Sequence, residues 1–236
     1  MKPSGKVRVG VSGFSYASWK GKFYPKETKS EEYLPYYSQH LDTVEINSSF
    51  YAPPKEATVK GWAGRTEERF RFSFKAPQLI THILKLGEGS SEAAARFSKT
   101  LSLLGPRLGP VLFQLPPYIK ANEKLLADFL SKTSGTRVFE FRHESWLQDS
   151  TYRLLDEQGV GFCIAETEEM KPVFQVTGGF AYFRLRRDAY DARSIERWGK
   201  EIGKLVRDLP ISYVYLRHDD TGENAILAQK LAEKLS

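Results

Sequence analysis

Eight short runs rich in β-branched and aromatic residues recur along the chain, and segments with helical spacing separate most of them. Runs of this length and composition are typical of strands. The expected strands cover residues 7–12, 43–50, 70–75, 111–115, 137–142, 161–166, 180–186 and 212–217. Alternating strands and helices form parallel βαβ units. Eight such units within 236 residues therefore predict an α/β fold, a (β/α)8 TIM-like barrel, whose usual length is about 250 residues.

The helical segments are expected at residues 30–41, 55–65, 90–104, 122–133, 150–158, 192–209 and 223–235. The connection between the sixth and seventh strands, residues 167–179, contains Pro172 and the pair Gly178-Gly179. These residues disfavour a helix, so we expect the sixth helix to be short or missing. The rival architecture is an open doubly wound sheet. It is disfavoured because residues 10–15, after the first strand, lack the Gly-x-Gly-x-x-Gly spacing of dinucleotide sites.

Composition narrows the class of protein further. The single cysteine, Cys163, rules out an intramolecular disulfide framework and a multi-cysteine metal cluster. No apolar run approaches the ~20 residues of a membrane span, and residues 1–14 contain no continuous apolar leader. No linker divides the chain. We therefore expect residues 1–236 to form one cytoplasmic domain with no membrane partner.

The formal net charge of +6 is concentrated near the start of the chain. Residues 1–30 hold seven basic residues against Glu27 alone, which accounts for the whole surplus. Lys20, Lys22 and Lys26 fall in the loop after the first strand, on the face where barrel active sites lie. The charge predicts an anionic partner and a basic rim around the mouth of the barrel.

Polar side chains occupy strand positions that should point into the barrel. Side chains alternate between the two faces of a strand, and the apolar positions are expected to face the helices. Barrel interiors are usually filled by Val, Ile and Leu, and unpaired buried charges are costly. The cluster is therefore either a ligand or catalytic site at the strand ends or an ion-pair network that fills the barrel. The inward ionic residues are Glu45, Lys75, Glu140, Arg142, Arg184 and Arg217.

Further candidate ligand contacts come from the same strands and from the loops that follow them. The alternation points the amides of Asn47 and Gln114 inward, where they could orient a ligand. Aromatic rings interleaved with lysines can stack on bases or sugars while the cations meet phosphates, or they can form a hydrophobic cap. The loop candidates are Tyr16, Trp19, Lys20, Tyr51, His82 and Trp146.

Long ordered motifs lie at the strand ends. They are Gly10-Val-Ser-Gly-Phe-Ser-Tyr16, Trp19-Lys-Gly-Lys-Phe-Tyr-Pro25, Thr43-Val-Glu-Ile-Asn-Ser-Ser-Phe-Tyr51 with Pro54, Phe72-Ser-Phe-Lys75, Thr81-His82, Gly109-Pro-Val-Leu-Phe-Gln-Leu-Pro-Pro117 and Glu140-Phe-Arg-His-Glu-Ser-Trp146. These sequences resemble the YecE-like family, also called domain of unknown function seventy-two. The resemblance implies a (β/α)8 barrel and no settled activity. The similarity of such barrels to endonuclease IV-like and sugar isomerase-like barrels motivates nucleic-acid hypotheses by fold analogy alone.

The last third of the chain departs from the family pattern. Where members tend to carry Arg-x-His-Gly in strand seven, this chain reads Arg184-Leu-Arg-Arg187. Where they tend to carry Asn-Asn after strand eight, it reads Leu216-Arg-His-Asp-Asp220. Altered ligand contacts are therefore expected in this half of the barrel.

Acid–base chemistry on an anionic substrate fits the inward residues. Glu45 and Glu140 lie on non-adjacent strands and are the candidate catalytic pair, because two carboxylates in different environments can act as acid and base. Lys75, Arg142 and Arg184 would neutralise a phosphate or carboxylate on the substrate.

No cofactor and no metal are expected. The four histidines supply few ligands for a metal cluster. His40 falls in a helix and His218 has the parity of a helix-facing residue, which leaves His82 and His143 near the mouth. Cys163 lies mid-strand, where cysteine is usually a small buried apolar residue.

Two functions of different classes remain open. The first is a metal-independent hydrolase or lyase that acts on a phosphorylated or otherwise anionic small substrate. The second is a non-catalytic barrel that binds nucleic acid through the lysines of the first loop. A structural or interaction module with a vestigial site is a third, less favoured interpretation.

Overall fold

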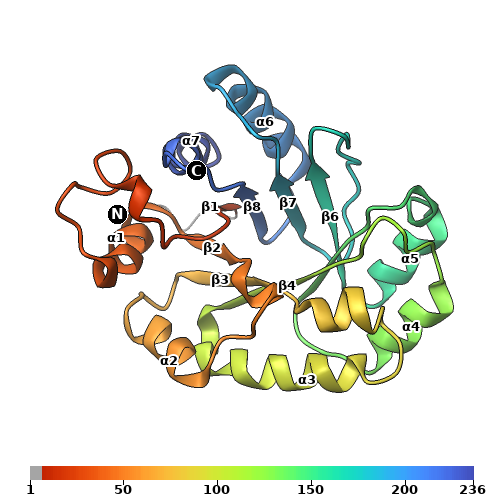
Figure 1. Cartoon of the computed structure of the whole chain (residues 1–236). Coiled ribbons are helices and arrows are strands. Elements are labelled where there is room, and N and C mark those ends of the chain that lie inside the picture. Colours follow the sequence, from red (N-terminus) through yellow and green to blue (C-terminus); the bar gives the residue numbers. More distant parts are fainter. Residues whose placement is uncertain (1–6) are drawn as a thin grey trace.

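Eight parallel strands form a nearly closed barrel with helices around it, as the sequence predicted (Figure 1). The computed structural model describes residues 7–236. The hydrogen-bonded order of the strands is β1-β8-β7-β6-β5-β4-β3-β2. The strands are β1 (Val7–Val11), β2 (Thr43–Ile46), β3 (Arg71–Lys75), β4 (Leu108–Gln114), β5 (Arg137–Glu140), β6 (Gly161–Glu166), β7 (Ala181–Leu185) and β8 (Ser212–Leu216).

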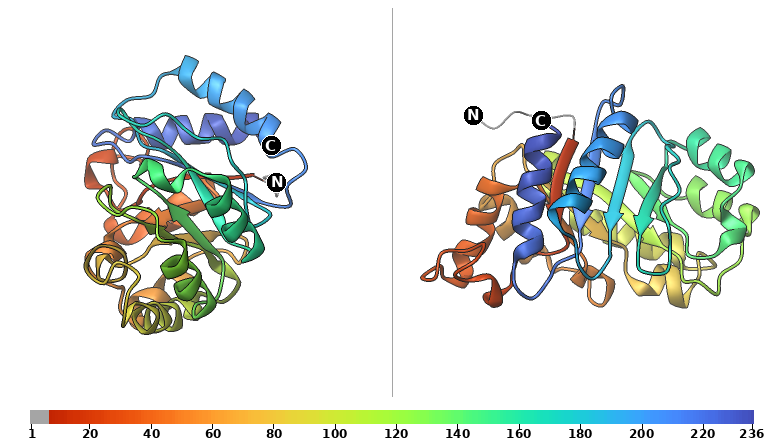
Figure 2. Two further views of the ribbon diagram at one scale, coloured as in Figure 1. Left: turned by 90° about the vertical axis from the view of Figure 1, so that its right-hand side faces the viewer. Right: turned by 90° about the horizontal axis from the view of Figure 1, so that it is seen from above.

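The helices lie outside the strands, and α7 packs on β1 and β8 with α6 beside it (Figure 2). Within the described residues no helix separates β6 from β7, which confirms the predicted gap. None of the helices in residues 7–236 is both long and apolar enough to cross a bilayer. The helices are α1 (Tyr33–His40), α2 (Glu56–Gly64), α3 (Ser90–Leu101), α4 (Glu123–Ser131), α5 (Asp149–Glu157), α6 (Ala192–Leu205) and α7 (Glu223–Lys234).

The second strand is shorter than predicted, and its early end shapes the mouth of the barrel. Asn47 adopts helical backbone angles, φ −93° and ψ −20°, so the chain leaves the sheet there. The residues predicted to continue the strand instead form a short 3-10 turn, Ser48–Phe50. This turn holds Asn47 and Phe50 at the C-terminal end of the barrel.

The outward faces of the strands are aromatic and pack beneath the helices. Phe72 of β3 stacks on Trp62 of α2 with 5.8 Å between ring centroids. Phe113 of β4 packs edge-on against Phe129 of α4 at 5.4 Å. Each such burial contributes about 1.5–3 kcal/mol. Because these apolar positions face outward, the polar positions between them face into the barrel.

A side-chain hydroxyl joins β1 to β2, where the strand ladder is weakest. In the part of the chain that the structure describes, an isolated bridge between Ser12 and Glu45 takes the place of a ladder between these strands. The Tyr37 hydroxyl of α1 accepts from the Val11 N–H at 2.9 Å and donates to the Thr43 carbonyl at 3.0 Å. Gly10 permits this approach, since a Cβ there would lie 1.9 Å from the Thr43 carbonyl oxygen.

Replacing Tyr37 tests this connection between β1 and β2. Tyr37→Phe should lower the free energy of unfolding by about 1–3 kcal/mol, because it leaves a buried N–H and a buried carbonyl without partners. Tyr36→Phe is the matched control, since that hydroxyl makes no hydrogen bond within residues 7–236. Urea unfolding curves would measure both changes. Equal losses in the two variants would contradict a role for the Tyr37 hydroxyl.

Candidate functional site

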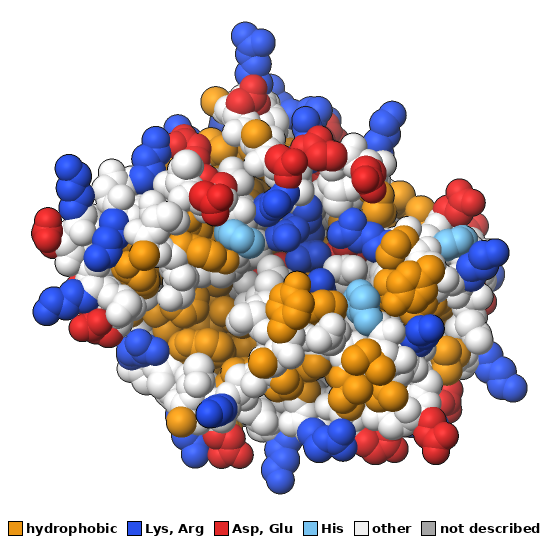
Figure 3. Space-filling view, in the orientation of Figure 1, with side chains coloured by type: hydrophobic (Ala, Val, Ile, Leu, Met, Phe, Trp, Pro, Cys, Tyr) orange, Lys and Arg blue, Asp and Glu red, His pale blue; other side chains and the backbone are white. Residues whose placement is uncertain are grey.

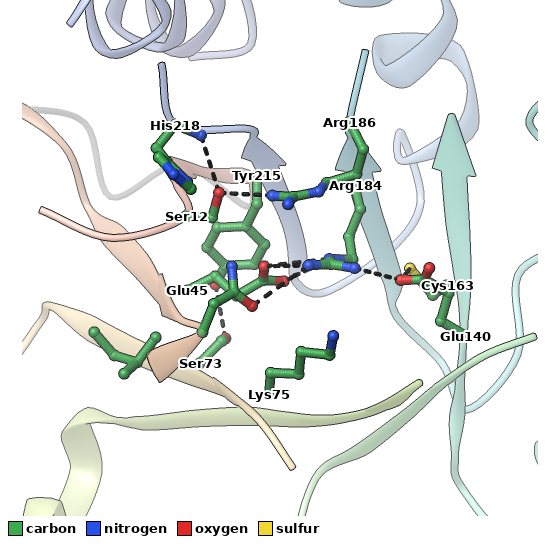
Figure 4. Close-up of polar contacts among 12 residues, drawn as sticks. Ser12, Glu45, Ser73, Lys75, Glu140, Cys163, Arg184, Arg186, Tyr215 and His218 are labelled. Carbon is green, nitrogen blue, oxygen red and sulfur yellow. Dashed lines mark hydrogen bonds and ion pairs between the residues drawn. The ribbon is translucent and has the colours of Figure 1, made fainter. Parts of the chain in front are cut away.

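Three buried ionic side chains meet at the C-terminal end of the barrel interior (Figure 4). Arg184 of β7 forms a two-point contact with Glu45 of β2, from Nη2 at 2.8 Å and from Nε at 2.9 Å. Its Nη1 donates to Oε2 of Glu140 on β5 at 2.6 Å. The exposed fractions are 2% for Arg184 and 0% for both glutamates. The predicted convergence of these residues is therefore present, and they bind one another.

The charges in this network stabilise each other against burial. Burial alone disfavours ionisation of a carboxyl group. The positive charge of Arg184 outweighs that effect and lowers the pKa of Glu45. At Glu140 the charges of Arg184 and Arg142 outweigh burial and lower the pKa to about 2. Burial would lower the pKa of Arg184, but the two carboxylates hold it well above its usual value. All three groups are ionised at neutral pH.

Neutral polar groups complete the hydrogen bonds around the network. Tyr182 donates to Oε2 of Glu45 at 2.8 Å, and the Cys163 thiol lies 3.7 Å from Oε2 of Glu140. One layer below, the Tyr215 hydroxyl lies 2.7 Å from the Ser73 hydroxyl and 2.7 Å from the Thr43 hydroxyl. The Tyr182 bond therefore helps to hold Glu45 in place, while the three hydroxyls below satisfy one another, as buried polar groups require.

Two cations that flank the network have no carboxylate partner within residues 7–236. Arg186, which directly follows the end of β7 at Leu185, donates from Nη1 to the Ser12 hydroxyl at 2.7 Å, its one side-chain hydrogen bond to residues 7–236. Lys75 at the end of β3 places Nζ 3.9 Å from the centroid of the Phe50 ring. Within the described chain no carboxylate lies within ion-pair distance of either cation. Burial and the charge of Arg184 lower the pKa of Lys75 to about 8 and that of Arg186 to about 10.

The charges of the interior do not cancel. Two carboxylates face four cations: Arg184, Arg142, Arg186 and Lys75. Arg142 pairs with Glu140, so the surplus of two positive charges resides on Arg186 and Lys75. Basic side chains gather in the middle of this face of the molecule, with a histidine on either side (Figure 3).

Asn47 and His218 present polar atoms without partners in residues 7–236. The side-chain nitrogen of Asn47 is buried and unpaired, while its oxygen lies 3.5 Å from Nη2 of Arg184. His218 does not face a helix, contrary to its predicted parity, because β8 ends at Leu216 and the alternation ends with it. Its ring stacks on Tyr16 at 4.8 Å, and its buried Nδ1 has no partner.

The rim of the mouth is more nearly neutral than predicted. Arg217 lies beyond the end of β8 and pairs with the exposed Asp188, so it belongs to the rim and not to the interior. Lys22 pairs with Glu223 at 2.8 Å. Lys20 and Lys26 are exposed. Two further basic residues of the predicted surplus, Lys2 and Lys6, lie outside the described residues.

The candidate aromatic residues divide into buried and accessible groups. Trp19 is fully buried and donates to the Asp219 carbonyl at 2.7 Å. Trp146 is 1% exposed, stacks on Phe141 and donates to the Ile119 carbonyl at 2.9 Å. Both tryptophans therefore act as part of the hydrophobic cap that was the alternative interpretation. Tyr16 is half-buried, whereas Tyr51 is 77% exposed.

Of the other candidates, Gln114 and His82 remain near the mouth. Gln114 is half-buried and in register with Glu140 of the neighbouring strand. The His82 ring packs edge-on against Phe50 at 4.9 Å, and its Nδ1 lies 2.8 Å from the Thr81 hydroxyl. Within residues 7–236, no three side chains of His, Cys, Asp or Glu are grouped so that they could hold a metal ion.

Arg186 is a residue that the sequence patterns did not single out as a ligand contact. Its spacing of two from Arg184 is the signal for an inward direction, although β7 ends one residue earlier, at Leu185. Sequence spacing did not show that Arg184 would be fully paired while Arg186 would lack a carboxylate, because pairing depends on distances across the barrel.

Comparison with known sequences decides the family. The family described as "Protein of unknown function DUF72" matches residues 8–236. The chain belongs to this family. The resemblance seen in the sequence is thereby confirmed. This DUF72 protein is 25% identical to YunF of Bacillus subtilis over 270 residues, which covers 97% of this chain and 94% of the relative. It is 31% identical to YecE of Escherichia coli over 142 residues, 57% of this chain and 52% of YecE.

Solved structures agree with this assignment. A crystal structure of a DUF72 family protein from Thermotoga maritima matches with a TM-score of 0.85 and 27% identity, covering 97% of this chain and 98% of the other. A DUF72 protein from Enterococcus faecalis matches with a TM-score of 0.77 and 19% identity, with the same coverage of each chain. The likeness confirms the barrel of this DUF72 protein, and the names of these relatives describe no reaction.

Arg184→Met tests the energetic weight of the network. It should lower the free energy of unfolding by about 3–5 kcal/mol, because two buried carboxylates lose their counter-charge. Arg187→Met, which removes a partly exposed pair with Glu168, should change it by less than about 1 kcal/mol. Denaturant titration at pH 7 would measure both. A loss below about 1 kcal/mol for Arg184→Met would show that the network does not stabilise the fold.

Acid should weaken the fold through the same carboxylates. The pKa of Glu140 is lowered from 4.5 to about 2. Its contribution to stability is therefore complete above the unfolded-state value and is lost as the pH falls from 4.5 through about 2. Glu45 contributes in the same direction. We expect the free energy of unfolding to fall across this window, less steeply in Glu140→Gln than in the exposed control Glu168→Gln. Identical slopes in the two variants would contradict this origin.

Proposed function

We propose that this DUF72 protein binds a small anionic molecule, phosphorylated or carboxylated, at the C-terminal mouth of its barrel. The observation that carries the proposal is the surplus of two partly buried cations, Arg186 and Lys75, that no carboxylate of residues 7–236 pairs with. A partly buried cation without a counter-charge is unfavourable, and a bound anion would relieve that cost. The lowered pKa values of both groups reflect the same unfavourable environment.

The groups at the mouth have complementary roles in this proposal. Arg186 keeps free N–H donors beside its bond to Ser12, and a guanidinium can contact two oxygens of one phosphate or carboxylate. Lys75 supplies a point charge on the other side of Arg184 (Figure 4). The unpaired amide nitrogen of Asn47 adds a neutral donor. Glu45 and Glu140 hold Arg184 in place, which supports the structural interpretation of these two residues over the catalytic one.

A metal-independent hydrolase or lyase reaction would then depend on Lys75. Glu140 has a pKa near 2 and stays ionised and paired at neutral pH, so it cannot donate a proton there. Lys75 has a pKa of about 8, near the range in which a general acid or base works best. Lys75 is therefore the mouth residue best suited to exchange a proton with a bound substrate.

A small ligand fits the charges better than a nucleic acid does. The unpaired cations lie in the floor of the mouth, whereas a duplex backbone is contacted by exposed lysines and arginines. Two rim cations are already paired, Lys22 with Glu223 and Arg217 with Asp188. Tight binding of an oligonucleotide, weakening steeply with salt and depending on Lys20 and Lys26, would favour the nucleic-acid alternative.

Calorimetric titration with inorganic phosphate and with sulfate tests the proposal. Arg186→Met and Lys75→Met should each weaken binding about tenfold or more, since each removes a charge-assisted contact. Neither cation pairs with a carboxylate within residues 7–236, so both variants should fold. Arg187→Met, one residue along the chain, should bind as the natural protein does. If all three variants bind both anions with unchanged affinity, the mouth is not the anion site.

The pH dependence of sulfate binding provides a second test. Sulfate keeps its charge between pH 6 and pH 10, whereas Lys75 loses its proton as the pH rises through about 8. The affinity should therefore fall above pH 8 in the natural protein. The same titration of Lys75→Met should show a weaker fall, and equal falls would exclude Lys75 as the titrating group.

A further inference from the structure

An apolar groove lies beside the charged mouth, between the loops that follow β2 and β3 and the helix α3. Its volume is about 400 Å³, which falls within the range of about 300–1,000 Å³ typical of small-ligand sites. Most of its lining is hydrophobic. The main apolar lining residues are Phe50, Tyr51, Leu79, Ile80, Ile83 and Phe97.

Phe50 connects the groove to the anion site. Its ring lines the groove and also lies 3.9 Å from Nζ of Lys75, measured to the ring centroid. His82 packs on the edge of the same ring and sits within the short helical turn Leu79–Ile83, which forms one wall. The groove and the anion site are therefore neighbours that share Phe50.

Three large apolar side chains that line the groove are exposed without an evident structural need. The exposed fraction is 77% for Tyr51, 61% for Ile83 and 41% for Leu79. Contiguous exposed apolar patches mark places where a protein binds a ligand or a partner. Hydrophobic side chains lie next to the basic centre on this face of the molecule (Figure 3).

We propose that the anion bound by Lys75 and Arg186 carries an aromatic or alkyl group, and that this group occupies the groove lined by Phe50, Leu79 and Ile83. The inference rests on the proposed function and narrows its substrate class to amphipathic anions. The position of Phe50, which lines the groove and contacts Lys75, favours this occupant over a second protein chain. The positive end and the apolar end of the site then match the two halves of one small molecule.

The experiment compares inorganic phosphate with phenyl phosphate and 1-naphthyl phosphate by calorimetric titration. The aromatic esters should bind about tenfold or more tightly than inorganic phosphate, since burial of a ring removes apolar surface from water. In the double variant Leu79→Ser/Ile83→Ser this preference should fall to about twofold or less. Leu103→Ser removes an exposed leucine outside the groove and should keep the preference.

The outcomes separate the two proposals. If the natural protein shows no preference for the esters, or if the double variant keeps it, the groove does not hold the apolar group. If the preference persists and the double variant instead changes the molecular mass seen by light scattering, the groove is a contact between copies of the chain. If Lys75→Met and Arg186→Met bind phosphate and both esters as the natural protein does, the proposed anion site itself fails.

Discussion

The two-point contact between Arg184 and Glu45, extended to Glu140, is the interaction on which the arrangement of the barrel interior depends. It ties β7 to β2 and β5 across the barrel. An aliphatic interior would contribute comparable stability without the desolvation cost of charges. Ionic groups at these positions are tolerable because each has a counter-charge and because Tyr182 completes the hydrogen bonds of Glu45. Removing one of these three side chains leaves a buried charge on its partner without a counter-charge.

The same network determines what remains available to a ligand. Both carboxylates are already paired, with Arg184 and Arg142. Burial and the positive charge of Arg184 lower the pKa values of the neighbouring Lys75 and Arg186. Lys75 and Arg186 therefore lie in a field that an anion would stabilise. The charged residues of this barrel thus divide into a part that is paired internally and a part, Arg186 and Lys75, that pairs with no carboxylate of residues 7–236. A count of charged residues in the sequence does not reveal this division.

Regular patterns predicted the barrel, while contacts between distant residues were needed to interpret the site. Eight strand-like runs and their alternation placed Glu45, Glu140 and Arg184 inside correctly, because alternation is a local property of the backbone. His218 and Arg217 were misplaced because they follow the end of β8, where alternation no longer holds. Trp19 and Trp146 lie in loops, whose side-chain directions depend on packing against segments far along the chain, here Asp219 and Ile119. Which cations would lack partners depends on distances between strands, and a single sequence contains no record of them.

The way β1 joins the barrel has a consequence for biosynthesis. Its ladder runs along β8, with Val7 beside Ser212 and Val11 beside Leu216, while β2 holds it through one bridge and the Tyr37 hydroxyl. β1 therefore gains its main partner only after the residues up to the end of β8 have been made. Closing a loop of this length carries an entropy cost that grows with the logarithm of its length. The strands from β2 to β7 can pair in order during synthesis, and the pairing of β1 with β8 completes the ring once β8 has been made.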